Sequence, residues 1–178
     1  MNKDLADTFG NLVNRCLAFA AARFDSTVPE AGDAGAAEDK LAAELGVRLK
    51  RLRGHHEALA LRKAAEEVRA IWRLANAYLA DAAPWTVIRD DPERAAAIVR
   101  TGINLVRIAA LAGWPFIPSA AAEVLRSLGE DPELPSWVED GKEALSAIPA
   151  GRRFRVPSLL FPKISAADLA SAACRRPG

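Results

Sequence analysis

The sequence predicts an all-α fold, a bundle of about five helices with an irregular C-terminal strap and a short final helix. Apolar residues recur at three- and four-residue spacing over long stretches, and alanine, which favours helix, is heavily used. Hydrophobic residues make up 51% of the 178 residues, which is enough for one domain to bury a sizeable core. We therefore divide the chain into a helical bundle, residues 1–150, and the strap with its short helix, residues 151–178.

The first predicted helix covers residues 3–24 and has two distinct faces. Its buried face is predicted from five apolar residues at helical spacing: Leu5, Phe9, Leu12, Cys16 and Phe19. The stripe on the other side is the candidate binding face, and it consists of Asp7, Asn11, Asn14, Arg15, Ala18 and Ala22. Residues 25–35 follow as a loop, because they contain Pro29, Gly32 and Gly35.

The next two helices are predicted from longer apolar patterns. The second helix carries Leu41, Leu45, Leu49 and Leu52, and Gly54 is expected to end or bend it. The third covers residues 56–82, and Pro84 stops it because proline disfavours helical geometry in the residue before it. Its predicted apolar anchors are Leu59, Leu61, Val68, Ile71, Trp72, Leu74, Tyr78 and Leu79.

The fourth helix has the clearest start signal in the chain. Asp91 is a capping residue, Pro92 suits the first helical position, and Glu93 complements the helix dipole, so we predict a helix over residues 92–112. A short helix then runs from Pro118 to about residue 128, closed by Gly129. Beyond it the chain is predicted to be irregular, with an extended segment at 154–164 and a last amphipathic helix at 165–173.

The charge balance excludes a broadly basic nucleic-acid binder. The chain has 24 Lys and Arg against 23 Asp and Glu, a net charge of +1, so any RNA contact must be local. Basic residues do cluster, and a solvated helix face is the commoner explanation, although the first cluster is also a candidate for sequence-independent phosphate contacts. The clusters are Arg48, Lys50, Arg51, Arg53, Arg62 and Lys63, then Arg152, Arg153 and Arg155, and finally Arg175 and Arg176.

Other classes of protein are disfavoured by absent signals. We see no apolar run of about 18 residues and no signal peptide, so we expect a cytoplasmic protein without a membrane partner. Cys16 and Cys174 are far apart and lack any C-x-x-C, which predicts no disulfide and no metal site; Cys16 is expected to be a small buried hydrophobe. His55 and His56 are expected to be exposed in a connection between helices, and no phosphate-binding loop or catalytic triad is present.

Two segments carry a more specific signal: Asn-Leu-Val-Asn-Arg at residues 11–15, and Asn-Ala-Tyr-Leu at 76–79 leading to Pro84-Trp85. In order and rough spacing, they resemble the anticodon-binding domain of methionyl-tRNA synthetases. The resemblance covers nearly the whole chain and continues through four further segments, at residues 102–105, 115–118, 128–129 and 160–164.

The resemblance implies which residues bind RNA. Recognition of an unstacked base needs an aromatic surface and side-chain groups that match its Watson–Crick edge. By resemblance, Trp85 supplies the surface, Asn11 and Arg15 read base edges of the methionine anticodon CAU, and Pro84 sets the position of Trp85. The remaining aromatic and amide side chains are assigned to packing, to the cover of the core or to internal hydrogen bonds: Trp72, Trp114, Trp137, Asn76, Tyr78 and Asn104.

The resemblance also implies a chain without catalysis of its own. Neither a His-Ile-Gly-His-like nor a Lys-Met-Ser-Lys-Ser-like sequence occurs, so ATP and methionine would bind an absent catalytic domain, and no cofactor is expected here. We expect an isolated domain whose partners are methionine tRNA and the catalytic domain, in cis or in trans, and not DNA.

Two alternatives remain open at this point. One is a protein-interaction or regulatory domain that has kept the bundle but no longer reads tRNA, and binds a protein through an exposed apolar strap at Leu159, Leu160, Phe161 and Ile164. The other is the helical anticodon domain of a class I synthetase for another amino acid.

Overall fold

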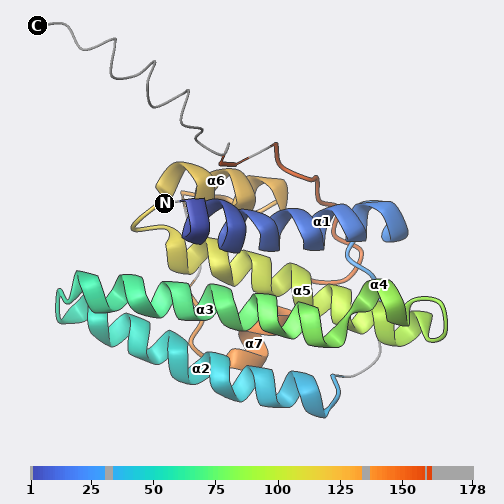
Figure 1. The fold of residues 1–178 in the computed structure, drawn as a ribbon, viewed down its shortest axis with the longest axis horizontal. Helices are drawn as coiled ribbons and strands as arrows, with labels where there is room; N and C mark the ends of the chain where they lie inside the picture. Colours follow the sequence, from blue (N-terminus) through green and yellow to red (C-terminus); the bar gives the residue numbers. More distant parts are fainter. Residues whose placement is uncertain (1, 31–33, 134–136, 159, 162–178) are drawn as a thin grey trace, which may run out of the picture.

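A long apolar helix, α5 (Pro92–Gly113), runs through the middle of the molecule, and the other helices pack around it (Figure 1). The computed structural model describes residues 2–30, 34–133, 137–158 and 160–161. Besides α5, it contains η1 (Asn2–Gly10), α1 (Asn11–Phe24), α2 (Ala36–Glu57), α3 (Leu61–Ala82), α4 (Pro84–Val87), α6 (Pro118–Ser127) and α7 (Gly141–Ser146). No strand forms within these ranges, so the all-α prediction is confirmed.

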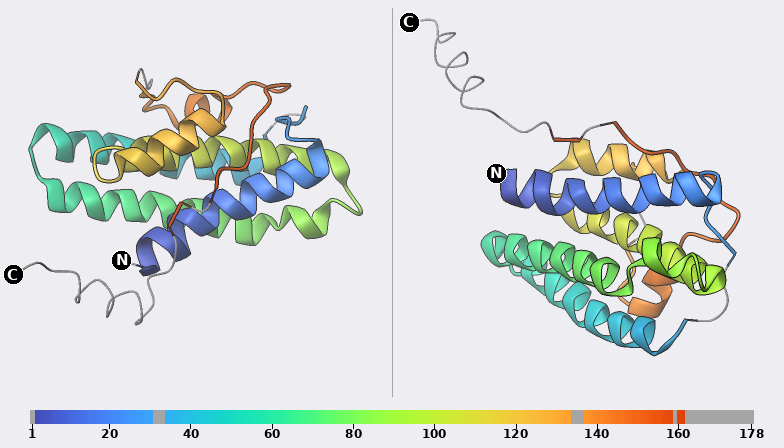
Figure 2. Two further views of the ribbon diagram at one scale, coloured as in Figure 1. Left: turned by 90° about the horizontal axis from the view of Figure 1, so that it is seen from above. Right: turned by 45° about the vertical axis from the view of Figure 1, so that its right-hand side comes forward.

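The helices lie in layers on either side of α5. Helices α2 and α3 form an antiparallel hairpin on one side, whereas α1 and α6 lie on the other (Figures 1 and 2). Helix α5 contacts α1, α2, α3, α4, α6 and α7, and nearly all of its residues are buried. By length and composition α5 could cross a membrane, with a mean hydropathy of 1.5, but 94% of that stretch is buried inside the bundle. It is therefore the core helix of this fold. The sequence has no unbroken apolar run long enough to span a bilayer, and α5 is apolar enough over that length only when its average is taken.

The starts and ends of the helices around α5 follow the predicted local signals. Asp91 Oδ1 accepts a hydrogen bond from the Arg94 backbone N–H at 2.8 Å, and Pro92 occupies the first helical position. Gly129, with φ of 74°, follows α6 in the left-handed region that glycine adopts without strain. The first helix extends over the predicted residues, although its first nine adopt the wider π geometry of η1.

The α2–α3 connection lies later than predicted. Helix α2 continues through Gly54 to Glu57, and α3 begins at Leu61, because a glycine on an open helix surface costs too little to end a well-packed helix. Leu59, with φ of 52° and 81% exposed, belongs to the turn, so its prediction as a buried anchor was wrong. Leu61 is 58% exposed for the same reason: both residues lie at the hairpin tip, beyond the reach of the core.

The two histidines are also placed differently from the prediction. His55 and His56 lie in the last turn of α2 rather than in the connection, and both are half-buried. The His56 ring lies 6.1 Å from the ring of Phe116. Within the described part of the chain, no cluster of His, Cys, Asp and Glu could hold a metal ion.

Helix α7 lies in the region that was predicted to be irregular, so that prediction was wrong for residues 141–146. Asp140 Oδ1 accepts hydrogen bonds from the backbone N–H groups of Lys142 and Glu143, at 2.9 and 3.0 Å, and so caps the helix. A Cβ at position 141 would lie 1.9 Å from the carbonyl oxygen of Ala42. Gly141 therefore permits a close approach between α7 and α2, a role that depends on tertiary packing.

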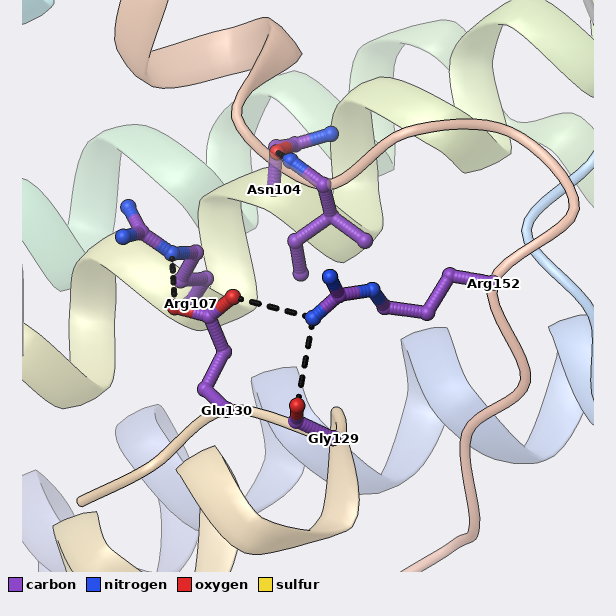
Figure 3. Close-up of polar contacts among 6 residues, drawn as sticks. Asn104, Arg107, Gly129, Glu130 and Arg152 are labelled. Atoms are coloured by element: carbon purple, nitrogen blue, oxygen red, sulfur yellow. Dashed lines mark hydrogen bonds and ion pairs between the residues drawn. The ribbon is translucent and has the colours of Figure 1, made fainter.

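A group of polar contacts fixes the strap to the end of α6 and to α5 (Figure 3). Glu130 accepts from Arg107 Nε at 2.9 Å and from Arg152 Nη1 at 3.2 Å, and Arg152 also donates to the carbonyl of Gly129. Asn104 is the expected buried amide: its Oδ1 accepts from the Ile148 N–H at 2.7 Å. These bonds hold residues 148–152 against the bundle.

The alternative of a protein-interaction domain predicted an exposed apolar strap, but the described residues at its apolar end pack against the core. Leu160 and Phe161 are half-buried against the core, and the Phe161 ring lies edge-on to Phe9 with centroids 6.3 Å apart. Leu159, Ile164, the predicted helix at 165–173 and Cys174 lie outside the described residues. Cys16 is buried as expected, and burial raises the pKa of its thiol to about 12.

Candidate nucleic-acid interface

The turn after α3 presents Trp85 to solvent while burying the residue before it. Helix α3 ends at Ala82, and Ala83 adopts the left-handed conformation, with φ of 40°. Pro84 then starts α4 at the first helical position, where its missing N–H costs nothing. Pro84 is buried and Trp85 is 37% exposed, so this corner holds the indole at the surface of the bundle.

Helix α1 brings two side chains to the same indole. The Arg15 Cζ lies 4.6 Å from the centroid of the Trp85 ring, within range of a cation–π interaction. Phe19, one turn later on α1, meets the ring edge-on, with centroids 6.3 Å apart and an interplanar angle of 88°. The structure thus brings together Arg15 and Trp85, two of the predicted site residues, from distant parts of the sequence.

Asn11 lies one turn before Arg15 and faces a different space. It is half-buried and lines a cavity of about 510 Å³ between the start of the first helix and the strap. Polar residues on one side and strap residues on the other line this cavity: Asp7, Asn11, Asn14, Pro157, Leu160 and Phe161. Neither Arg15 nor Trp85 is among its lining residues, so the predicted trio forms an exposed arginine–indole pair beside a separate, partly polar cavity.

The other tryptophans take the places expected of packing residues. Trp72 is 3% exposed, and its Nε1 donates to the carbonyl oxygen of Ala109 at 3.0 Å. Trp114 is half-buried against the core, and Trp137 covers one wall of a cavity of about 520 Å³ that also contacts Trp114. Among the four tryptophans, Trp85 is the one that pairs with an arginine on the candidate binding face.

Several arginines of the basic clusters form ion pairs with neighbouring carboxylates. Arg48 pairs with Glu44 and Glu67, and Arg53 pairs with Glu57 and Glu139. The arginines of the second cluster pair in the same way: Arg152 with Glu130, Arg153 with Asp25, and Arg155 with Glu123. These contacts favour the solvated-face interpretation over a phosphate-binding patch. Arg175 and Arg176 lie outside the described residues.

One polar group near the Trp85 corner was missed by sequence reasoning. Glu38 is 2% exposed, and its carboxylate accepts hydrogen bonds from the Tyr78 hydroxyl and from both terminal nitrogens of Arg94. Burial alone would raise the pKa of Glu38, but the bonds from Arg94 and Tyr78 hold it below the usual value of 4.5. At the sequence level Glu38 resembles an ordinary first-turn glutamate, and its bond from the Gly35 N–H does fill that capping role.

The Glu38 carboxylate should make stability fall on acidification. Because its pKa is lower in the folded than in the unfolded chain, its contribution is complete above pH 4.5 and is lost as pH falls below that value. We expect Glu38→Gln to cost about 1–3 kcal/mol at neutral pH, and the difference from the unchanged protein to shrink below about pH 4.5. Urea unfolding of both proteins from neutral to acidic pH measures this difference in the free energy of unfolding. A difference that widens in acid would contradict the assignment of Glu38 as a buried carboxylate paired with Arg94.

Comparison with known proteins identifies the fold. Residues 28–178 match the family described as the anticodon binding domain of methionyl tRNA ligase. The chain belongs to this family. The methionine–tRNA ligase of Dinoroseobacter shibae is 48% identical over 168 residues, covering 94% of the chain and 29% of the ligase. The methionine–tRNA ligase of Streptomyces avermitilis is 41% identical over 172 residues, covering 96% of the chain and 30% of the ligase.

Solved structures give the same family. The apo form of Mycobacterium tuberculosis methionyl-tRNA synthetase aligns with a TM-score of 0.81 at 30% identity, covering 92% of this chain and 33% of that one. The chain therefore corresponds to the anticodon-binding domain of methionyl-tRNA synthetases, and spans under a third of the curated relatives that it matches. The catalytic domain of those relatives is not part of these 178 residues. The family match includes Pro84 and Trp85, and begins after Asn11 and Arg15.

Proposed function

We propose that this domain binds the anticodon loop of methionine tRNA and recognises the CAU anticodon at the Arg15–Trp85 pair. The observation that carries the proposal is the contact itself: an exposed indole from the middle of the chain and a guanidinium from near its start lie 4.6 Å apart on the surface of a domain of this family. Membership of the family supports tRNA as the ligand.

Stacking on Trp85 would supply binding energy, and Arg15 would supply selectivity. Arg15 lies over one face of the ring, and Phe19 meets it edge-on, so a base stacks on the opposite face or takes the place of the guanidinium. When the base takes the place of the guanidinium, the planar donor fork of Arg15 lies beside the base edge and can form two parallel hydrogen bonds with acceptors there. A base on the opposite face is beyond the reach of Arg15, because the indole lies between them.

Asn11 would read a second base from the neighbouring cavity. Its amide offers both a donor and an acceptor, and the cavity wall that carries it also carries Asn14 and Asp7. Because Asn11 lies one helical turn from Arg15, about 6 Å along the axis, two adjacent unstacked bases can meet the two side chains. Pro84 acts indirectly, by fixing the backbone that carries Trp85.

The activity of the whole protein is a further part of the proposal. Relatives are named methionine–tRNA ligases, and we place ATP and methionine in their catalytic domain, which would be the partner of this domain in cis or in trans. The alternative of a protein-interaction module has no support in the described residues, since Leu160 and Phe161 pack against the core.

Binding of RNA stem-loops tests the proposal. We expect the wild-type chain to bind a CAU anticodon stem-loop more tightly than one with a changed first anticodon base, and to bind both more weakly as salt rises. Fluorescence anisotropy with labelled stem-loops measures both affinities. Equal affinity for the two stem-loops would refute CAU recognition.

Exchanging Arg15 for lysine separates charge from base reading. Arg15→Lys keeps the positive charge but loses the planar fork and its stacking on Trp85. We therefore expect the salt dependence to persist while discrimination between the two stem-loops falls by about 1–3 kcal/mol, roughly 5- to 150-fold. Arg23→Lys, in the last turn of α1, is the control and should leave discrimination unchanged. An unaltered ratio for Arg15→Lys would exclude Arg15 as a reader of base edges.

A further inference from the structure

The corner that presents Trp85 is closed by a buried carboxylate from a third helix. Glu38, in the first turn of α2, accepts from Arg94 Nη1 at 2.8 Å and from Arg94 Nη2 at 2.7 Å. It also accepts from the Tyr78 hydroxyl, and from the Gly35 N–H at 2.9 Å. The two oxygens of this carboxylate together accept from four donors, so neither oxygen lacks a hydrogen bond.

The two side-chain partners of Glu38 flank the Trp85 corner in sequence. Tyr78 lies in the last turns of α3, and Arg94 lies in the first turn of α5. Between them the chain makes its left-handed step at Ala83, starts α4 at Pro84 and presents Trp85. The Glu38 carboxylate therefore bridges the two ends of the segment that carries the indole, and fixes both to α2.

The corner is also held by packing, since α4 contacts α5 and Pro84 is buried. Ala83 holds a positive φ, which costs a non-glycine residue energy and must be stabilised by its surroundings. Hydrogen bonds within the corner are local, from Thr86 and Val87 to Ala83 and from Asp91 to Val87. Glu38 adds hydrogen bonds that tie both ends of the corner to α2, while α1 meets the corner at the exposed side, through Arg15 and Phe19.

We infer that Glu38 is a positioning residue for RNA recognition: by clamping Tyr78 and Arg94 it holds the Trp85 corner where the indole meets Arg15. The inference rests on the proposed function, and adds a residue that does not itself touch RNA. Paired and buried, Glu38 keeps the recognition site in its binding geometry before RNA arrives, so its loss lowers the fraction of molecules that are ready to bind.

Two variants test the clamp, with one matched control. Glu38→Gln keeps the size of the side chain but removes the charge that holds Arg94, and Tyr78→Phe removes a single donor. Glu130→Gln is the control, because Glu130 also accepts from two arginines, Arg107 and Arg152 (Figure 3). Arg107 lies thirteen residues after Arg94 on α5, about 20 Å along the axis and away from the corner.

Two readouts are measured on the full 178-residue chain, below the unfolding temperature of each variant. Affinity for the CAU stem-loop is expected to fall about 5-fold or more for Glu38→Gln, to fall less for Tyr78→Phe, and to stay unchanged for Glu130→Gln. Amide hydrogen exchange at residues 86–91 is expected to accelerate in Glu38→Gln at least tenfold more than in Glu130→Gln. A purely structural role would instead give the two glutamine variants the same affinity and the same exchange at the corner.

The outcomes separate this inference from the proposed function. If the wild-type chain fails to bind the stem-loop, the proposed function fails, and the exchange data alone decide whether Glu38 holds the corner. If wild-type binds and Glu38→Gln binds equally well, the positioning role is overturned while the proposed function stands. Unchanged exchange at residues 86–91 in Glu38→Gln also overturns it.

Discussion

Replacing Trp85 with alanine is expected to lower affinity for the CAU stem-loop by about 5- to 150-fold, since stacking of one base on an aromatic ring contributes about 1–3 kcal/mol. The preference over a changed first anticodon base should disappear with it, because Arg15 then lacks the surface that holds the base beside its donor fork. Stability should fall less than in Trp72→Ala, since the indole of Trp85 is 37% exposed and that of Trp72 is 3% exposed.

The measurement is the ratio of the two dissociation constants, before and after the substitution. Trp137→Ala is the matched control: Trp137 is 38% exposed, and it lines a cavity with His56, away from α1. The control should retain wild-type affinity and wild-type discrimination. A Trp85→Ala variant that still prefers CAU would show that recognition takes place elsewhere on the domain.

Replacing Trp72 with alanine is expected to be the most destabilising of these changes, by about 3–5 kcal/mol. Trp72 is 3% exposed, and its ring packs on Phe9 with centroids 5.0 Å apart. The substitution empties space between α3, η1 and α5, and it leaves the carbonyl of Ala109 without its indole donor. For a domain of ordinary stability this is a large share of the free energy of unfolding.

Chemical denaturation measures the effect of Trp72→Ala. The control is Leu61→Ala, an apolar truncation at the hairpin tip where the side chain is 58% exposed, and it should cost under about 1 kcal/mol. Similar losses for the two variants would contradict the assignment of Trp72 to the core.

Features fixed by local chemistry could be predicted from the sequence. The start of α5 depends on Asp91 and Pro92 themselves, and both act as predicted. The end of α3 follows from Pro84, which constrains the residue before it whatever the fold. Apolar spacing also predicted part of the buried face of the first helix, although Leu5 and Phe19 of that face are only half-buried.

Features that depend on tertiary contacts could not be predicted in this way. Gly54 and Gly141 are the same residue type, yet Gly54 lies on an open helix surface, whereas Gly141 permits close contact with Ala42. Glu38 carries no sequence signal that distinguishes a buried clamp from a surface cap, since its partners are 40 and 56 residues away.

The candidate site shows the same division. Helical spacing places Asn11 and Arg15 on one face, but the approach of Arg15 to Trp85 was expected from family resemblance and not from spacing. In the structure Arg15 meets Trp85, whereas Asn11 lines a cavity shared with the strap. The positions of residues 157–158 and 160–161 decide that difference, and no local pattern predicts them.

The most direct test of the account follows Trp85 itself during RNA binding. With 5-fluorotryptophan incorporated, and each resonance assigned by substitution, the CAU stem-loop should shift the fluorine resonance of Trp85 and leave that of the buried Trp72 in place. Saturable binding of the CAU stem-loop with an unmoved Trp85 resonance would contradict the claim that the arginine–indole pair is the recognition site.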